Sequence, residues 1–214
     1  MMILVSNLPY LLKAALVTIH LSFWIILGSL LIGTVFGMLS LSENRTVRYL
    51  VLTYVFIFRG IPLLVQLFFL YFALPAFGIH LSPFVTAVIV MSIYDGAYVT
   101  EIIRGALVAI SKGQWDAARS LGYTHWKIMF KIILPQGVRY AIPLLVNQAT
   151  IIIKETSLVS TIMLWELSLA GKEIVQRSFM VFRIFGGVAI IYFILCYSLS
   201  LFGQRLEKKY TYAH

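Results

Sequence analysis

The feature that most constrains this chain is an uncharged run, from Ala14 to Leu41, that contains no Asp, Glu, Lys or Arg. A helix crosses the hydrocarbon of a bilayer with about 20 apolar residues, so this run is long enough for one tilted crossing. Over the whole chain 61% of residues are hydrophobic and 12% are charged, whereas ordinary globular domains have roughly 45–50% and 25%. The sequence therefore predicts an all-α membrane protein and excludes an ordinary soluble domain.

Four further apolar stretches follow the first one, and we expect five transmembrane helices. The second stretch is broken by Arg59, Gly60 and Pro62. The break places its membrane part after Pro62 and a short helix before it. No internal repeat or linker is evident, so residues 1–214 are interpreted as a single transmembrane domain. The predicted spans cover residues 14–41, 61–77, 84–103, 140–164 and 184–203.

Basic residues are distributed unevenly over the loops between these spans. Loops rich in Lys and Arg stay on the cytoplasmic side of a membrane. One set of loops holds twelve of the 17 basic residues, which predicts an N-terminus outside and a C-terminus in the cytoplasm. These twelve are Arg45, Arg48, Arg59, Arg104, Lys112, Arg119, Lys127, Lys131, Arg139, Arg205, Lys208 and Lys209.

The net charge of +9 does not indicate nucleic-acid binding, because the charges lie between apolar runs and form no continuous basic face. The single cysteine, Cys196, excludes an internal disulfide and a cysteine-based metal site. The four histidines lack metal-ligand spacing. We therefore expect no bound metal in this chain.

One predicted cytoplasmic segment, DAARSLGYTHWKIMFKIILP, differs from the apolar regions around it. Its first half favours a helix in which Ala117, Ala118 and Leu121 form a small apolar face, with Gly122 placed to end it. An alanine face is too shallow to anchor in lipid but suits a groove on another protein. We expect this helix to dock on a partner.

The second half of the segment predicts another helix, which Thr124 can cap. Its apolar stripe comprises Trp126, Met129, Phe130 and Ile133, with Lys127 and Lys131 on the other side. Such a helix can rest on anionic lipid at the membrane surface. Pro135 is expected to interrupt it.

These residues resemble a known family. The order Asp116, Ala117, Ala118, three residues, Gly122, nine residues, Ile132, one residue, Leu134 and Pro135 is similar to the EAA loop of membrane subunits of bacterial ATP-binding-cassette importers. The leading Glu of that loop is Asp116 here, a shorter carboxylate. Stretches within residues 58–158, among them FRGIPLLVQLFFLYFALP and GAYVTEIIRGAL, resemble the polar amino acid branch, with histidine, glutamine, arginine and cystine permeases.

The resemblance implies the fold of a type I importer permease, placed in the inner, or cytoplasmic, membrane of a bacterium. It implies that Asp116, Ala117, Ala118, Leu121 and Gly122 form a coupling helix that docks on a separate ATPase subunit. The chain contains no G-x-x-x-x-G-K-[ST] motif, so ATP and Mg would be bound by that partner. We also expect a second permease subunit, an extracytoplasmic binding protein and an amino acid substrate, and no catalysis by this chain.

Ionisable residues at membrane depth are costly and suggest function. Asp95 in the third span has no basic neighbour within a turn. Two interpretations stay open: Asp95 faces the pathway and binds a substrate ammonium group, or it pairs with Lys154 or Arg183. Gln66 and Tyr98 are weaker substrate candidates, because a neighbouring helix can satisfy one amide or phenol.

A second group lies near the predicted cytoplasmic end of the third span. Glu101 and Arg104 are three residues apart on one helix, and Arg59 lies at a similar depth. These three predict either a structural ion network or a gate.

The fourth span carries a polar stripe, which normally faces a bundle interior or a wet cavity. Lys154 and the adjacent Glu155 point about 100° apart on a helix, so each needs its own partner. An amino acid zwitterion would supply both charges, while contacts across a subunit interface or at an outer gate explain them equally well. The substrate candidates on this span are Asn147, Gln148, Thr150, Lys154, Glu155 and Ser157.

The loop before the last span holds Glu166, Glu173, Lys172 and Arg177. These residues either contact the binding protein or form a solvated charged loop.

Three classes of function are open to a membrane protein with this sequence. An ion-coupled secondary transporter or channel would explain the charges but not the alanine-faced helix, and a membrane enzyme would need a clustered acid, base or metal set that the sequence does not offer. An ATP-driven importer explains both features. Acidic and basic pathway candidates nearly balance, which slightly favours a neutral or cationic amino acid, cystine among them.

Overall fold

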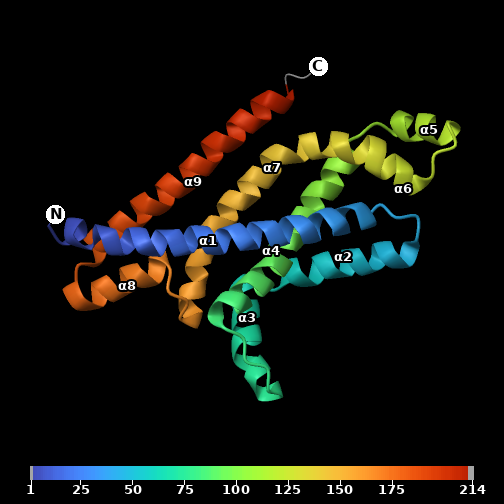
Figure 1. Ribbon diagram of the computed structural model, residues 1–214. Helices are drawn as coiled ribbons and strands as arrows, with labels where there is room; N and C mark the ends of the chain where they lie inside the picture. Colours follow the sequence, from blue (N-terminus) through green and yellow to red (C-terminus); the bar gives the residue numbers. More distant parts are fainter. Residues whose placement is uncertain (1, 212–214) are drawn as a thin grey trace.

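The computed structural model describes residues 2–211, and side chains from Ser6 to Leu206. Every regular element in this part of the chain is helical (Figure 1). The α-helices are α1 (Met2–Leu39), α2 (Arg45–Gly60), α3 (Leu63–Phe68), α4 (Pro83–Val108), α5 (Lys112–Ser120), α6 (His125–Ile128), α7 (Leu134–Glu155), α8 (Leu167–Ser178) and α9 (Val181–Thr211). Short π or 3-10 segments are η1 (Phe69–Ala73), η2 (Leu74–Phe77), η3 (Met129–Ile133) and η4 (Thr156–Ile162).

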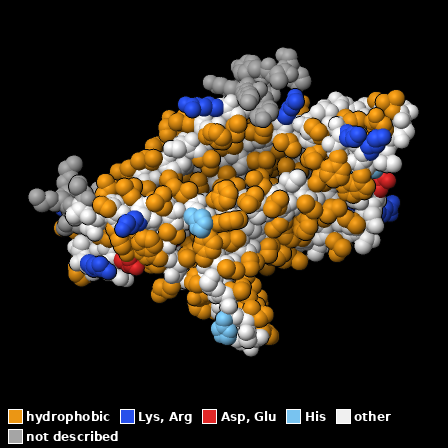
Figure 2. All heavy atoms as spheres, viewed as in Figure 1, with side chains coloured by type: hydrophobic (Ala, Val, Ile, Leu, Met, Phe, Trp, Pro, Cys, Tyr) orange, Lys and Arg blue, Asp and Glu red, His pale blue; other side chains and the backbone are white. Residues whose placement is uncertain are grey.

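Within the described residues, four helical segments are long and apolar enough to cross a membrane, namely Ser6–Leu39, Pro83–Val108, His125–Ile162 and Val181–Leu206. A bent pair, Arg45–Gly60 and Leu63–Phe77, gives five if it counts as one span. The all-α membrane fold is thus confirmed. Hydrophobic side chains cover most of the visible face between the two ends of the molecule (Figure 2).

The bend between α2 and α3 lies where the sequence predicts a break. Pro62 has no backbone N–H, and Ile61 before it is extended, with φ −104° and ψ 130°. The chain turns by 97°. The Gln66 side-chain amide donates to the carbonyls of Phe58, at 2.9 Å, and Ile61, at 2.8 Å, so it satisfies acceptors that the break leaves without helical partners.

Pro135 does not interrupt its helix, and the predicted interruption is wrong. The chain runs from α6 through η3 into α7, with Pro135 in the first turn of α7. The wider π turn before the proline makes room for its ring against the carbonyl four residues earlier. Gln136 donates to the Ile132 carbonyl at 2.7 Å, which again gives a backbone acceptor a side-chain donor.

Helices α1 and α4 approach each other so closely at Gly28 and Gly33 that a residue with a side chain would not fit there. A Cβ on Gly33 would lie 2.3 Å from Val99 Cγ1, and one on Gly28 would lie 2.3 Å from Ser92 Oγ. Small residues let helix backbones approach in a membrane, where association depends on close packing. This contact forms the centre of the fold, and the other helices are arranged around it (Figure 1).

We predict that Gly33→Leu disrupts the contact between α1 and α4. The added side chain would also meet the Thr100 backbone N, which a Cβ would approach to 2.9 Å, so overpacking should destabilise the protein by about 1–3 kcal/mol. Thermal unfolding of the detergent-solubilised protein measures this loss. Gly105→Leu is the matched control, because a Cβ on Gly105 meets nothing within 4 Å; equal midpoints for the two variants would contradict the prediction.

Candidate coupling surface and translocation site

The predicted docking helix is α5, at the same end of the molecule as the loop between α1 and α2 (Figure 1). Part of its expected apolar face is buried in the protein, and part is exposed. Ala118 is 3% exposed and packs into a buried cluster with Ile128 and Met129. Ala117 is exposed, and Leu121 is 73% exposed. The outward surface is therefore formed by Ala117 and Leu121, while Ala118 holds α5 against the protein.

Gly122 follows α5 in the left-handed region, with φ +76°, and its N–H donates to the Arg119 carbonyl at 2.8 Å. This conformation favours glycine and ends the helix as predicted. Asp116 is exposed on α5, and its carbonyl accepts a hydrogen bond from the Ser120 hydroxyl at 3.0 Å. The Asp116 carboxylate is therefore open to a partner.

The apolar stripe predicted for the next helix is also divided. Met129 and Ile133 are fully buried, whereas Trp126 and Phe130 are exposed and stack with ring centroids 6.1 Å apart. Thr124 is the N-cap residue of α6, but its side chain makes no capping bond. Inner apolar residues therefore anchor this helix in the protein, and the outer aromatic pair faces away from it.

Contacts from distant parts of the sequence hold α5 in place. Gln136 donates to Gln114 Oε1 at 2.7 Å. Glu43, in the loop between α1 and α2, lies 3.5 Å from both Arg119 and His125. The sequence alone does not indicate these contacts of Glu43, Gln114, Gln136 and His125, because a local pattern does not reveal pairs so far apart in the chain.

Asp95 on α4 is fully buried, at 0% exposure, and accepts a hydrogen bond from Gln148 of α7 at 2.8 Å. Neither of the two proposed ion pairs forms in the described part of the chain. Lys154 is exposed, and Arg183 contacts Met180 Sδ at 3.6 Å. The Asp95 neighbour is instead Glu155, whose side chain is within hydrogen-bonding reach.

The polar side chains of the fourth span face two ways, as the angle of about 100° between Lys154 and Glu155 predicts. Helix α7 ends at Glu155, and Ser157 belongs to the 3-10 segment η4. Lys154 and Ser157 line a hollow of about 280 Å³ beside α8 and α9, whereas Gln148 and Glu155 face Asp95.

The two remaining residues of the predicted polar stripe make no contact with Asp95. Asn147 is exposed, and Thr150 donates to the Val146 carbonyl at 3.0 Å.

A hollow of about 440 Å³ between α2 and α4 is lined by several residues, among them Arg59, Tyr98 and Glu101. Arg104 forms a two-pronged ion pair with Glu101, at 2.9 and 2.7 Å. The Arg59 guanidinium lies 4.7 Å from the centre of the Tyr98 ring, and the Tyr98 and Tyr94 hydroxyls are 3.2 Å apart. The structure thus brings Arg59, Tyr98 and Glu101 to one hollow, with Arg104 as the ion-pair partner of Glu101.

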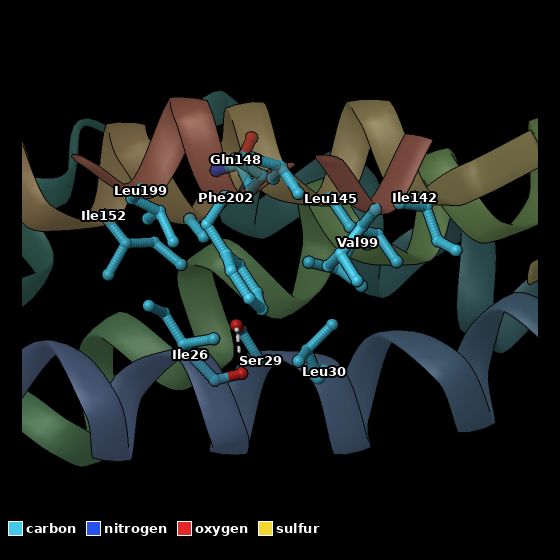
Figure 3. Close-up of a pocket in the computed structure, with 13 residues that line it drawn as sticks. Ile26, Ser29, Leu30, Val99, Ile142, Leu145, Gln148, Ile152, Leu199 and Phe202 are labelled. Carbon is cyan, nitrogen blue, oxygen red and sulfur yellow. Dashed lines mark hydrogen bonds between the residues drawn. The ribbon is translucent and has the colours of Figure 1, made fainter. Parts of the chain in front are cut away.

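A separate pocket of about 300 Å³ lies between α1, α4, α7 and α9 (Figure 3). Its lining is almost wholly apolar, and its Ser29 hydroxyl donates to the Ile26 carbonyl at 3.0 Å. The pocket offers too few polar partners for a charged or polar ligand. Its lining suits hydrocarbon.

The expectation of a solvated charged loop before α9 is wrong for Glu166, which is buried, whereas Lys172 and Arg177 are exposed. Glu166 is 0% exposed and caps α8 by accepting from the N–H groups of Ser168 and Leu169, each at 2.9 Å. It also accepts from Tyr192 of α9 at 2.8 Å and Thr18 of α1 at 3.4 Å. Glu166 therefore joins three helices.

Two neighbouring charged residues, Glu173 and Lys172, also form hydrogen bonds within the protein. Glu173 accepts from the Tyr10 hydroxyl and from Trp165 Nε1. Lys172 donates to the Ser160 hydroxyl at 2.8 Å.

The fold and the outward-facing helix α5 define a membrane subunit of a transport complex. The sequence matches the family model "Binding-protein-dependent transport system inner membrane component" over residues 29–212. The chain belongs to this family.

Curated relatives support that assignment. The chain is 39% identical to the L-cystine transport system permease protein TcyB of Bacillus subtilis, covering 90% of this chain and 82% of TcyB. It is 37% identical to the glutamine transport system permease protein GlnP of Escherichia coli, covering 94% and 93%.

Solved structures agree with the fold. A crystal structure of an amino acid ABC transporter with histidines matches with a TM-score of 0.89 and 30% identity, covering 96% of each chain. An inward-facing MetNI methionine ABC transporter matches with a TM-score of 0.79 at 18% identity, covering 94% and 95%, which supports the fold alone.

We predict a pH-dependent contribution of Glu166 to stability. Burial raises the pKa of the Glu166 carboxyl, although hydrogen bonds from Ser168, Tyr192, Leu169 and Thr18 act in the opposite direction. With a raised folded-state pKa, the stabilising contribution is complete below the pKa of the unfolded chain and is lost as the pH rises through the folded-state value. Over the pH window that begins at about 4.3, the value for a glutamate in an unfolded chain, the unfolding midpoint of the wild type should therefore fall more with rising pH than that of Glu166→Gln.

The measurement is thermal unfolding in detergent across that pH window. Asp116→Asn, which changes an exposed carboxylate on α5, is the control and should follow the wild type. Parallel pH profiles for the wild type and Glu166→Gln would contradict the prediction.

Proposed function

We propose that this chain is the non-catalytic permease subunit of an ATP-driven importer of polar amino acids. The observation that carries the proposal is α5, a short helix whose inner side is locked into the protein by Ala118 while Ala117 and Leu121 are exposed. A helix anchored in this way can transmit a load from a docked partner. In the family, that partner is an ATPase subunit that binds ATP and Mg, and this chain carries no Walker A motif.

The same proposal gives the chain three further partners. They are a second permease subunit, either a copy or a sibling, an extracytoplasmic substrate-binding protein, and the amino acid itself. The location is the inner, or cytoplasmic, membrane of a bacterium. Since α5 and α6 lie at the opposite end of α1 from α8 (Figure 1), we place α5 in the cytoplasm and α8 and the N-terminus outside, with the C-terminus inside.

The substrate site is proposed to include Glu155, Lys154 and Ser157, since these polar residues of the fourth span reach or approach the surface. Asn147 and Thr150 stay candidates on the same helix. Asp95 and Gln148 lie behind Glu155 and would act through it, while Tyr98 would act with Arg59, Glu101 and Arg104 near the cytoplasmic end. Gln66 is engaged at the α2 to α3 bend.

The chemical class of substrate is a neutral or cationic polar amino acid, with cystine as one candidate. Relatives named for cystine and glutamine transport support this choice. The apolar pocket of Figure 3 is not a candidate site, because an amino acid there would leave its ammonium and carboxylate groups unpaired. An ion-coupled transporter or channel would leave the exposed face of α5 without a role.

The test is a substitution on the outward surface of α5. Leu121→Asp places a charge where the ATPase is expected to dock, and it should lower ATP-dependent uptake of labelled glutamine, arginine or cystine by about 10-fold or more. Uptake is measured in liposomes that contain the assembled importer, together with co-purification of the ATPase. The protein should unfold at the wild-type temperature, because Leu121 is exposed.

Ile79→Asp is the matched control, since Ile79 is an exposed apolar residue in the loop after η2, far from α5. It should retain uptake and ATPase association. Full uptake by Leu121→Asp, or uptake by the wild type that persists without ATP, would overturn the proposed function.

A further inference from the structure

Two carboxyl groups, Asp95 of α4 and Glu155 of α7, meet inside the membrane part of the protein. Their side chains are within hydrogen-bonding reach of each other. Asp95 Oδ1 accepts from Gln148, but Asp95 Oδ2 and Glu155 Oε2 are buried and have no hydrogen-bond donor among the described residues. Each carboxyl therefore has one buried oxygen to which no described residue donates a hydrogen.

No ion pair compensates these two carboxyls among the described residues, although the Lys154 ammonium acts on Glu155 electrostatically. Lys154 is adjacent to Glu155 in sequence but is exposed and lines the hollow beside α8 and α9. The missing donor is therefore not a basic side chain of the described part of the chain.

The phenols nearest to the pair donate elsewhere or to each other. The Tyr54 hydroxyl donates to the Ile93 carbonyl at 2.6 Å, and the Tyr94 hydroxyl bonds with that of Tyr98 at 3.2 Å. Both Tyr54 and Tyr94 lie close enough to interact with Asp95 electrostatically. Neither supplies the hydrogen that the two orphaned oxygens lack.

Two facing carboxylates in a low-dielectric site cannot both stay ionised, because like charges repel and each loses its hydration. A single proton removes the conflict. It converts one oxygen into an O–H donor and leaves the other as its acceptor, so that both buried oxygens are satisfied.

We propose that Asp95 and Glu155 form a proton-binding site that holds one proton between Asp95 Oδ2 and Glu155 Oε2 at neutral pH. The pair then carries one negative charge. Asp95 is a positioning residue, fixed by Gln148, which orients Glu155 through the shared proton. The role of this site in transport rests on the proposed function. There the site presents one negative charge, rather than two, to the ammonium group of an amino acid substrate.

The test is infrared spectroscopy of the purified importer in detergent, in H₂O and D₂O at about pH 7.5. A protonated carboxyl has a C=O stretching band that shifts in D₂O, and an ionised one does not have this band. The wild type should show the band, and Asp95→Asn should lose it, because the amide supplies the N–H donor and leaves Glu155 ionised. The wild-type minus variant difference also cancels any contribution from Glu166.

Glu101→Gln is the matched control, since it removes a carboxylate of α4 that is ion-paired with Arg104. This variant should keep the band. A second pair of variants measures the positioning role. Asp95→Asn should unfold near the wild-type temperature. Asp95→Leu should unfold at a clearly lower temperature, because leucine neither accepts a hydrogen bond from Gln148 nor donates one to Glu155.

A wild-type spectrum without the band, or a wild-type minus Asp95→Asn difference spectrum without it, would overturn the proton-binding site. Equal unfolding temperatures for Asp95→Asn and Asp95→Leu would overturn the positioning role. The proposed function can fail separately, because a band that behaves as expected in a protein that does not import amino acids would leave the proton site standing.

Discussion

The structure depends on one constraint: hydrocarbon offers no hydrogen bonds to the backbone, so every peptide group inside the membrane must find its partner within the protein. Two proline-containing segments show how this chain meets that demand. At Pro62 the Gln66 amide donates to two carbonyls, and near Pro135 the Gln136 amide donates to the Ile132 carbonyl. Because these amides replace backbone donors, the chain can bend sharply at one site and continue through a π turn at the other.

The same demand governs the buried polar side chains. Glu166 receives donors from α1, α8 and α9, and its carboxylate is thereby fully engaged. Asp95 and Glu155 receive fewer donors, and the proposed shared proton supplies the missing one. The number of available donors thus distinguishes Glu166, which joins three helices, from a pair of carboxyls that each keep one oxygen without a donor.

Local sequence pattern predicted much of the fold and part of the site. Uncharged runs located the membrane helices, the Gly60 to Pro62 break located the bend, and Gly122 located the end of α5. Pattern could not predict which side of an apolar stripe faces the protein, as the buried Met129 and the exposed Phe130 illustrate. Nor could it predict the burial of Glu166, whose donor Thr18 lies 148 residues away, because long-range packing decides the surroundings of a polar group.

The buried cluster around Ala118 has a mechanical consequence. Besides Ala118 it contains Met38 of α1, Leu107 of α4, Ile128 of α6 and Ala141 of α7. A close-packed interior is nearly incompressible and transmits strain. A displacement of α5 by a few ångströms would therefore also move the ends of three membrane helices. Helix α5 and the buried cluster around it would then move as one rigid unit and not as a flexible segment.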